Sequence, residues 1–252
     1  MSGTLSGRGR FSAAIALENE NGYVAVIPDV KCISPKEGDL LRGRDPVATA
    51  EQLVRCGASV LSVVTEKKRF GGSPELLQAI AKKTDVPILR KDFITNDEML
   101  EETLELGAAA VLLICAIADE NVLSRLYKKA IELGLEPFVE VCNCDEMALA
   151  KKLGARLIGV NNRDIMTLEM DDGGPSRTAA LADGAPAGAV LVSESGIRSR
   201  GDAEMAARSG ANAILVGTAL WQADDIEAAY KSLKVNRLPV DVKGGAANAS
   251  YC

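Results

Sequence analysis

Charged side chains stand at or just behind the ends of several short apolar runs in this sequence, where acid–base chemistry needs them. Asp29 and Lys31 end the first such run, Lys91 follows the third, and Glu140 and Glu194 lie in the fifth and the seventh. The chain has no histidine, so proton transfer near neutral pH has to use Lys, Asp, Glu, Cys or Tyr. Burial beside other charges shifts pKa values enough for a lysine to act as an acid and a glutamate as a base. These five residues therefore predict a site for general acid–base catalysis.

The apolar runs that carry these residues predict the strands of a parallel sheet. Each run is short, β-branched and nearly continuous in its apolar character, which is typical of parallel strands that are buried on both faces. The eight runs cover residues 23–29, 59–65, 86–89, 109–114, 137–141, 156–160, 189–194 and 213–217.

The segments between the runs predict helices. Asp45-Pro46 and Ser73-Pro74 each combine a capping residue with proline at the first helical position. Eight strand–helix units in a chain of 252 residues predict a single-domain (β/α)8 TIM barrel, with a doubly wound open sheet as the alternative. We expect a short leader over residues 1–22, the barrel over 23–235 and a flexible tail over 236–252.

Such a barrel gathers the carboxyl ends of its strands at one mouth, where the active sites of this fold lie. Ser195-Gly196 and Gly217-Thr218 follow the seventh and eighth runs, a place where many such barrels bind a phosphate through backbone N–H groups. Ordinary tight turns, and ion pairs that close the rim of the barrel, are the alternative explanations for these residues.

Composition excludes several classes of function. Lys and Arg number 29 against 35 Asp and Glu, a net charge of −6, which argues against a nucleic-acid-binding protein with a basic face. The longest apolar run, 108–118, is too short for a membrane span, which needs about 20 residues. The N-terminal residues do not resemble a signal peptide. We therefore expect a cytoplasmic enzyme that acts on a small molecule, without nucleic-acid or membrane partners.

Seven segments of the sequence, in order, resemble the indole-3-glycerol phosphate synthase family of barrel enzymes. The most specific of them are LRKDF at 89–93, NNRD at 161–164 and SESGI at 193–197. The resemblance extends over residues 22–225 and covers the segments 29–38, 63–73, 87–93, 138–141, 157–164, 192–197 and 214–220.

This resemblance implies a substrate and a reaction. The substrate is 1-(2-carboxyphenylamino)-1-deoxyribulose 5-phosphate, a phosphosugar that the enzyme closes to indole-3-glycerol phosphate with loss of carbon dioxide and water. The reaction belongs to tryptophan biosynthesis, so other enzymes of that pathway are candidate partners. No organic cofactor and no metal are implied.

The resemblance also implies roles for individual residues. Lys91 is the general acid for ring closure, Glu140 transfers a proton in the dehydration, and Lys31 holds the substrate and delivers a second proton. The remaining residues position the reacting centre (Asn161, Glu194, Ser195), place the polar ends of the substrate (Ser34, Arg163), bind the phosphate (Gly196, Gly217, Thr218) or form an apolar wall for the aryl ring (Phe70, Phe93).

Several positions depart from the family pattern. Asp29 stands where the family usually has Glu, Lys36-Glu37 replaces a Ser-Lys pair, and Cys142 replaces a histidine. The leader before the first strand is also shorter than usual. These departures leave two alternatives open, namely a related enzyme acting on another aminated sugar phosphate and a non-catalytic phosphosugar-binding barrel.

Cysteines near the expected strand ends suggest two further alternatives. Cys32 beside Asp29 would suit a barrel isomerase that rearranges an aminated phosphosugar, although LRKDF argues against one. Cys32, Cys115 and Cys142 could together form a thiolate metal site. Their spacing lacks a C-x-x-C pair, so we expect them to be buried as small apolar residues.

Overall fold

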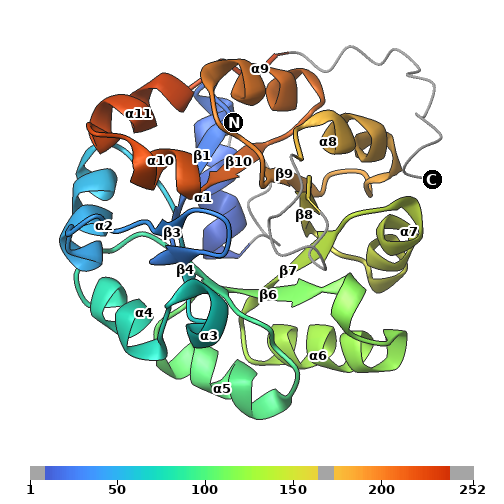
Figure 1. Ribbon diagram of the computed structural model, residues 1–252. Coiled ribbons are helices and arrows are strands. Elements are labelled where there is room, and N and C mark those ends of the chain that lie inside the picture. Colours follow the sequence, from blue (N-terminus) through green and yellow to red (C-terminus); the bar gives the residue numbers. More distant parts are fainter. Residues whose placement is uncertain (1–8, 164–172, 239–252) are drawn as a thin grey trace.

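A computed structural model describes residues 9–163 and 173–238 of the chain, and its centre is a closed barrel of eight parallel strands (Figure 1). The barrel confirms the (β/α)8 fold and excludes the open sheet. The strands, in the order in which they pair around the barrel, are β1 (Ala25–Val30), β10 (Ala213–Val216), β9 (Val190–Glu194), β8 (Leu157–Asn161), β7 (Glu136–Val141), β6 (Ala110–Ile114), β5 (Ile88–Lys91) and β4 (Leu61–Val64).

Each predicted apolar run overlaps one of these strands, and the boundaries differ by at most two residues. Among the carboxyl ends of the strands, the largest difference is at β5, which ends at Lys91 rather than at Leu89. Val63 and Val64 of β4 pair with Arg90 and Lys91, so the sheet continues into charged residues. The predicted strand ends too early because the prediction follows apolar residues only.

Helices surround the barrel and alternate with its strands (Figure 1). Asp45 and Ser73 cap their helices by accepting hydrogen bonds from the N–H groups of Ala48 and Leu76, as the sequence predicts. The outer helices are α2 (Pro46–Arg55), α4 (Pro74–Ala81), α5 (Asp97–Glu105), α6 (Glu120–Glu132), α7 (Cys144–Leu153), α8 (Ser176–Leu181), α9 (Arg200–Arg208) and α11 (Ile226–Leu233). Among the described residues, no helix is both long enough and apolar enough to cross a membrane.

Shorter elements lie in the loops at the carboxyl ends of the strands. The hairpin β2 (Ile33–Ser34) and β3 (Gly38–Asp39) follows β1, helix α3 (Lys67–Phe70) follows β4, and helix α10 (Thr218–Gln222) follows β10. In the described part of the chain, 3-10 helix is formed by Cys115–Ile117, after β6, and by Ala182–Gly184, between α8 and β9. The hairpin, α3 and α10 become part of the site described below.

An additional helix, α1 (Arg10–Glu20), closes the amino-terminal end of the barrel. Phe11 and Ile15 are fully buried and belong to the same apolar cluster as Ala25, Ala110 and Phe138 of the barrel strands. The sequence analysis places these residues in the leader, and the structure shows that they form part of the core. The expected tail is described only to Leu238, so its remainder lies outside the described residues.

The carboxylate of Glu136 holds the first turn of α1. It accepts hydrogen bonds from the N–H groups of Phe11, at 2.5 Å, and Ser12, at 3.1 Å. The first N–H groups of a helix have no partner within the helix, and a negative charge there also complements the helix dipole. A residue at the start of β7 therefore fixes α1 against the barrel.

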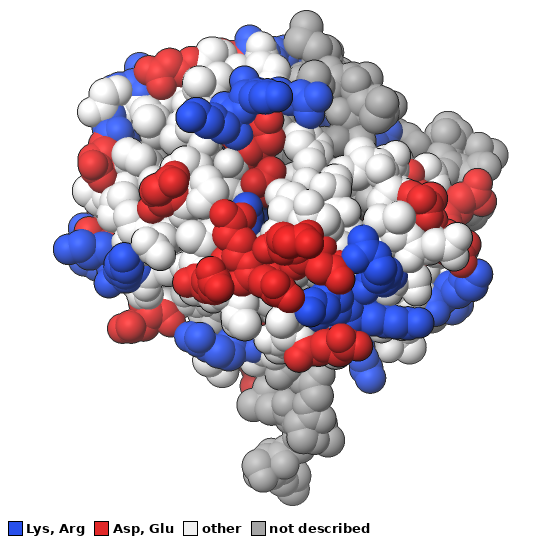
Figure 2. Space-filling model, turned by 90° about the horizontal axis from the view of Figure 1, so that it is seen from below, with Lys and Arg blue, Asp and Glu red and all other residues white. Residues whose placement is uncertain are grey.

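The charges on the outside of the barrel are balanced by ion pairs between neighbouring helices. On the face toward α5 and α6, acidic side chains gather beside lysine and arginine side chains (Figure 2). Asp97 and Glu101 of α5 pair with Arg125 and Lys129 of α6. Although the chain has an excess of acidic residues, these acidic side chains of α5 are therefore compensated by basic side chains of α6.

The position of Phe11 predicts that α1 contributes strongly to stability. Phe11→Ala should lower the free energy of unfolding by about 3–5 kcal/mol, because it leaves a cavity at the bottom of the barrel. Leu17→Ala is the matched control on the same helix, since Leu17 is 59% exposed, and it should change stability by less than about 0.5 kcal/mol. Urea denaturation measures both, and equal effects would contradict the role given to α1.

Candidate active site

A cavity of about 530 Å³ opens at the carboxyl ends of the barrel strands. The structure brings most of the predicted site residues together around it. They are Asp29, Lys31, Lys91, Phe93, Glu140, Asn161, Arg163, Ser195, Gly196, Gly217 and Thr218. Residues that are far apart in the sequence thus share one cavity, as the barrel fold predicts.

Lys91 lies at the centre of the charged residues. Its ammonium group contacts the carboxylate of Glu194, with which it forms a short ion pair, and lies 3.8 Å from Oε2 of Glu140. Both glutamates are buried, whereas the lysine side chain keeps 20% of its surface exposed toward the cavity. Lys91 is therefore the most accessible member of this group, although Glu140 also lines the cavity.

The surroundings of Lys91 keep it charged. Burial by itself lowers the pKa of Lys91, but the charges of Glu194, Glu140 and Asp29 outweigh burial and raise it above the usual value for lysine. Lys91 therefore holds a proton at neutral pH, which is the state that a general acid needs.

Glu194 experiences the opposite effect. It is completely buried, and its burial raises its pKa to about 7, although the charge of Lys91 opposes the rise and the neighbouring Glu140 adds to it. Within the described part of the chain, Glu194 Oε1 and Glu140 Oε2 are buried without a hydrogen-bond partner. The environment of Glu194 thus favours its protonated form.

Glu194 needs space in the interior of the barrel, and Gly159 provides it. A Cβ atom at position 159 would lie 2.3 Å from Glu194 Oε1 and 2.1 Å from the ring of Phe138. No side chain fits at that position while both neighbours keep their places. Because Glu194 lies behind Lys91, it does not line the cavity itself.

Asp29 is a buried residue of the cavity wall, and hydrogen bonds fix its position. Its Oδ1 accepts a hydrogen bond of 2.7 Å from the hydroxyl of Ser62, and its backbone carbonyl accepts one of 2.8 Å from the indole N–H of Trp221. Burial raises the pKa of Asp29, while Lys91 and Lys31 oppose the rise. Contacts with Ser62 and Trp221 therefore hold the aspartate that stands here in place of the family's longer glutamate.

Asn161 connects β8 to the charged centre. Its amide donates a hydrogen bond of 3.0 Å to Glu140 Oε1, and its own oxygen accepts one of 3.0 Å from the N–H of Arg163. One side chain thus orients the Glu140 carboxylate and also holds the start of the loop after β8. Asp164, which ends the NNRD segment, lies outside the described residues.

The turn after β9 has a backbone conformation that requires glycine at position 196. Ser195 and Gly196 both have positive φ angles, of 65° and 70°, a conformation that costs little only for glycine. A Cβ atom at position 196 would lie 2.2 Å from the carbonyl oxygen of Gly173. Asn162 stabilises the turn, because its amide donates a hydrogen bond of 3.0 Å to the Ser195 carbonyl. The sequence analysis did not assign a role to Asn162.

The loop after β1 is tied to helix α10, which begins just behind Gly217. Arg44 donates hydrogen bonds to the carbonyl groups of Trp221 and Ala223, and Arg42 donates one of 2.7 Å to Gln222. These carbonyls lie at the end of α10, where positive charge also complements the helix dipole. Both arginines therefore hold the segment that follows Lys31 against the expected phosphate site.

Apolar groups line the remaining walls of the cavity. Phe70 and Phe93 lie at its rim, where Lys31 Nζ is 5.7 Å from the centre of the Phe70 ring and Arg69 lies 5.1 Å from that of Phe93. Leu112, Ile114 and Leu215 add an aliphatic floor. The cavity thus has a charged part and an apolar part, as a substrate with an aryl ring and a phosphosugar would need.

Some residues differ from the sequence analysis in their placement. Ser34 does not line the cavity but lies buried in the β2–β3 hairpin, where its hydroxyl accepts a hydrogen bond of 3.3 Å from the N–H of Glu37. Lys36, Glu37, Arg198 and Gln222 line the cavity without having been assigned to it. They stand in loops and short elements, where no periodicity indicates which way a side chain points.

The cysteines near the strand ends are placed as buried or half-buried groups. Cys32 and Cys115 are buried, and burial is the main cause that raises the pKa of Cys115 to about 12. A thiol with this pKa stays protonated at neutral pH and is a poor metal ligand. Over the ranges that the structure describes, no group of three or more Cys, Asp or Glu side chains is arranged to hold a metal ion.

Comparison with known proteins gives the same family as the sequence motifs. The family model described as indole-3-glycerol phosphate synthase matches residues 8–233. A protein of that name from Pyrococcus furiosus is 47% identical over 200 residues, which cover 79% of this chain and 87% of the relative.

Further relatives extend this similarity to bacteria. Proteins with the same name from Pyrococcus abyssi and Listeria monocytogenes are 44% and 40% identical, over 82% and 88% of this chain and 90% and 86% of their own lengths. The prediction from the motifs is confirmed: the chain belongs to the indole-3-glycerol phosphate synthase family, whose members are carboxy-lyases.

Proposed function

We propose that this chain converts 1-(2-carboxyphenylamino)-1-deoxyribulose 5-phosphate into indole-3-glycerol phosphate, with Lys91 as the general acid. The observation that carries the proposal is the placement of Lys91, which reaches the cavity and is kept charged by Glu194 and Glu140. A positioned acid of this kind contributes about 10²–10⁴-fold to a rate.

Ring closure joins the aryl carbon that carries the carboxyl group to the carbonyl carbon of the ketose. The carbonyl oxygen gains negative charge as the bond forms, and Lys91 donates a proton to it. The carboxyl group then leaves as carbon dioxide and restores the aromatic ring. Stabilisation of charge as it develops by a fixed ammonium group is among the largest effects available to an enzyme.

Dehydration completes the indole ring. The new hydroxyl group leaves as water, which requires a proton donor, and the neighbouring ring carbon loses its proton to a base. We assign the proton transfer to Glu140, which Asn161 orients through a 3.0 Å hydrogen bond, with Lys31 as the second cation at the cavity. Asp29 interacts electrostatically with both lysines and helps to raise the pKa of Lys91.

The phosphate is assigned to the backbone N–H groups of Gly196, Gly217 and Thr218, with Arg163 nearby in the cavity wall. This choice is supported by the position of these residues in the cavity wall, at the ends of β9 and β10, where many barrels of this fold bind a phosphate. Phe70 and Phe93 receive the aryl ring at the opposite, apolar side. A cytoplasmic location and contacts with other pathway enzymes stay predictions from the sequence.

The role of Lys91 predicts the result of its removal. Lys91→Ala should lower kcat by at least about 10²-fold, because it deletes the proton donor. Lys152→Ala is the control, since Lys152 is 70% exposed on α7, and it should retain full activity. The assay follows indole fluorescence as the substrate is consumed, and circular dichroism checks that both variants fold. Turnover by Lys91→Ala above a tenth of the parent rate would exclude this role.

The raised pKa of Glu194 predicts how its contribution to stability changes with pH. In the unfolded chain this carboxyl loses its proton near pH 4.5, the ordinary pKa of glutamate, and in the folded chain only near pH 7. Between these values the unfolded state binds fewer protons, so Glu194 makes the free energy of unfolding fall as the pH rises.

Glu194→Gln removes this titration and tests the sign. The free energy of unfolding of the parent, minus that of Glu194→Gln, should be larger at pH 5 than at pH 8. Urea denaturation at the two pH values gives this difference. A difference that grows toward pH 8 would show that Glu194 is stabilised in its charged form and would contradict the assignment.

A further inference from the structure

Arg90 is a buried charged residue directly beside Lys91, and the catalytic assignments do not use it. Successive side chains of a strand point to opposite faces, so Lys91 points into the barrel mouth while Arg90 points outward, against helix α5. Only 2% of Arg90 is exposed. A buried charge of this kind is costly unless every donor finds a partner.

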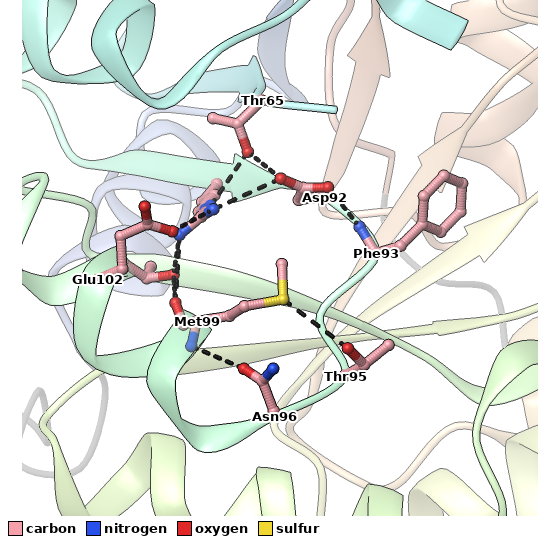
Figure 3. A network of polar contacts seen from close by, with 9 residues as sticks. Thr65, Asp92, Phe93, Thr95, Asn96, Met99 and Glu102 are labelled. Carbon is pink, nitrogen blue, oxygen red and sulfur yellow. Dashed lines mark hydrogen bonds and ion pairs between the residues drawn. The ribbon is translucent and has the colours of Figure 1, made fainter. Parts of the chain in front are cut away.

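The guanidinium group finds partners on two different sides, and Figure 3 labels Met99 and Glu102 on one side and Thr65 and Asp92 on the other. On the side of α5, it donates to the hydroxyl of Thr103 at 3.1 Å and the carbonyl of Met99 at 3.2 Å, and it pairs with Glu102 at 2.7 Å. On the side of the strand ends, its Nε donates to the hydroxyl of Thr65 at 3.0 Å, and it lies 3.5 Å from Asp92 Oδ2.

Thr65 extends this network to the residues that follow Lys91. Its hydroxyl donates a short hydrogen bond to Asp92 Oδ2, and the other oxygen of Asp92 accepts one of 2.8 Å from the N–H of Phe93. The backbone N–H of Thr65 also donates a hydrogen bond of 3.0 Å to the carbonyl of Lys91. The residues on both sides of Lys91, and the carbonyl of Lys91 itself, are thus tied to the end of β4.

We propose that Thr65, Arg90 and Asp92 form a clamp that positions the Lys91 ammonium group and the Phe93 ring for ring closure. This proposal rests on the role of Lys91 as the general acid. Thr65 does not line the cavity, whereas Lys91, Asp92 and Phe93 do, so Thr65 is a positioning residue that acts through its neighbours. A displacement of about 1 Å at a reacting group can cost about 10²-fold in rate.

Thr103 offers a matched control for Thr65. Both threonines are buried, and each hydroxyl accepts one hydrogen bond from Arg90. Each also donates one, Thr65 to Asp92 and Thr103 to the carbonyl of Met99 at 2.6 Å. Replacement by valine therefore costs Arg90 one acceptor in either case, but only the change at position 65 also removes a hydrogen bond to Asp92, which follows Lys91.

The test compares the steady-state kinetics of Thr65→Val and Thr103→Val in the full chain, with indole fluorescence as the readout. Thr65→Val should lower kcat by about 10-fold or more, as misplacement of the acid predicts, with KM changed by less than about 3-fold. Thr103→Val should keep kcat within about 2-fold of the parent. The melting temperature should fall in both Thr65→Val and Thr103→Val. Thr65→Ser keeps the hydroxyl and should restore most of the lost activity.

Several outcomes would overturn the clamp. Unchanged kcat in Thr65→Val, or an equal loss in Thr103→Val, would show that the network serves stability alone. If Thr65→Val does not fold, Thr65→Ala takes its place, because alanine adds no bulk. Thr65→Ala is then compared with Thr65→Ser, and equal kcat values in these two variants would exclude the clamp. Active Lys91→Ala would refute the role of Lys91 itself, whereas inactive Lys91→Ala with fully active Thr65→Val refutes only the clamp.

Discussion

The interaction on which the rest of the structure depends is the pairing of Lys91 with the buried carboxyl groups of Glu140 and Glu194. Buried charges are costly unless they compensate one another, and here three acids and two lysines share one end of a barrel. The charges of the acids keep the pKa of Lys91 high, and burial raises that of Glu194 to about 7. The burial of these charges costs free energy, but it also keeps Lys91 protonated where its side chain contacts the cavity.

The two ends of the barrel serve different purposes, since one end is apolar and stabilises the fold while the other carries the polar site. The amino-terminal end of the barrel is closed by α1 and filled with apolar side chains, so it can compensate for the polar residues buried at the other end. The loops at the carboxyl ends are held by specific polar contacts, such as those of Arg44 with the end of α10. The rigid strands set the position of each catalytic group, and these contacts restrict the loops between them.

The fold and most of the site follow from the sequence because both depend on regular patterns. Apolar runs locate the eight strands, and charged residues at strand ends meet at one mouth in any such barrel. The sequence does not predict α1 as part of the core, nor the roles of Thr65 and Asn162. These depend on contacts between residues far apart in the chain, and neither propensity nor periodicity records such contacts. A threonine within an apolar run gives no signal that its hydroxyl bridges an arginine and an aspartate.

The most direct test of this account is turnover by the purified chain of 1-(2-carboxyphenylamino)-1-deoxyribulose 5-phosphate, followed by the appearance of indole fluorescence. The intact arrangement of Lys91, Glu140 and Glu194 predicts turnover on the order of 1 s⁻¹ or above, as for an ordinary enzyme. In that case Asp29 serves as well as the longer acid. Saturable binding of the substrate without any turnover would contradict the account, because it would mean that the cavity is retained while its chemistry is not.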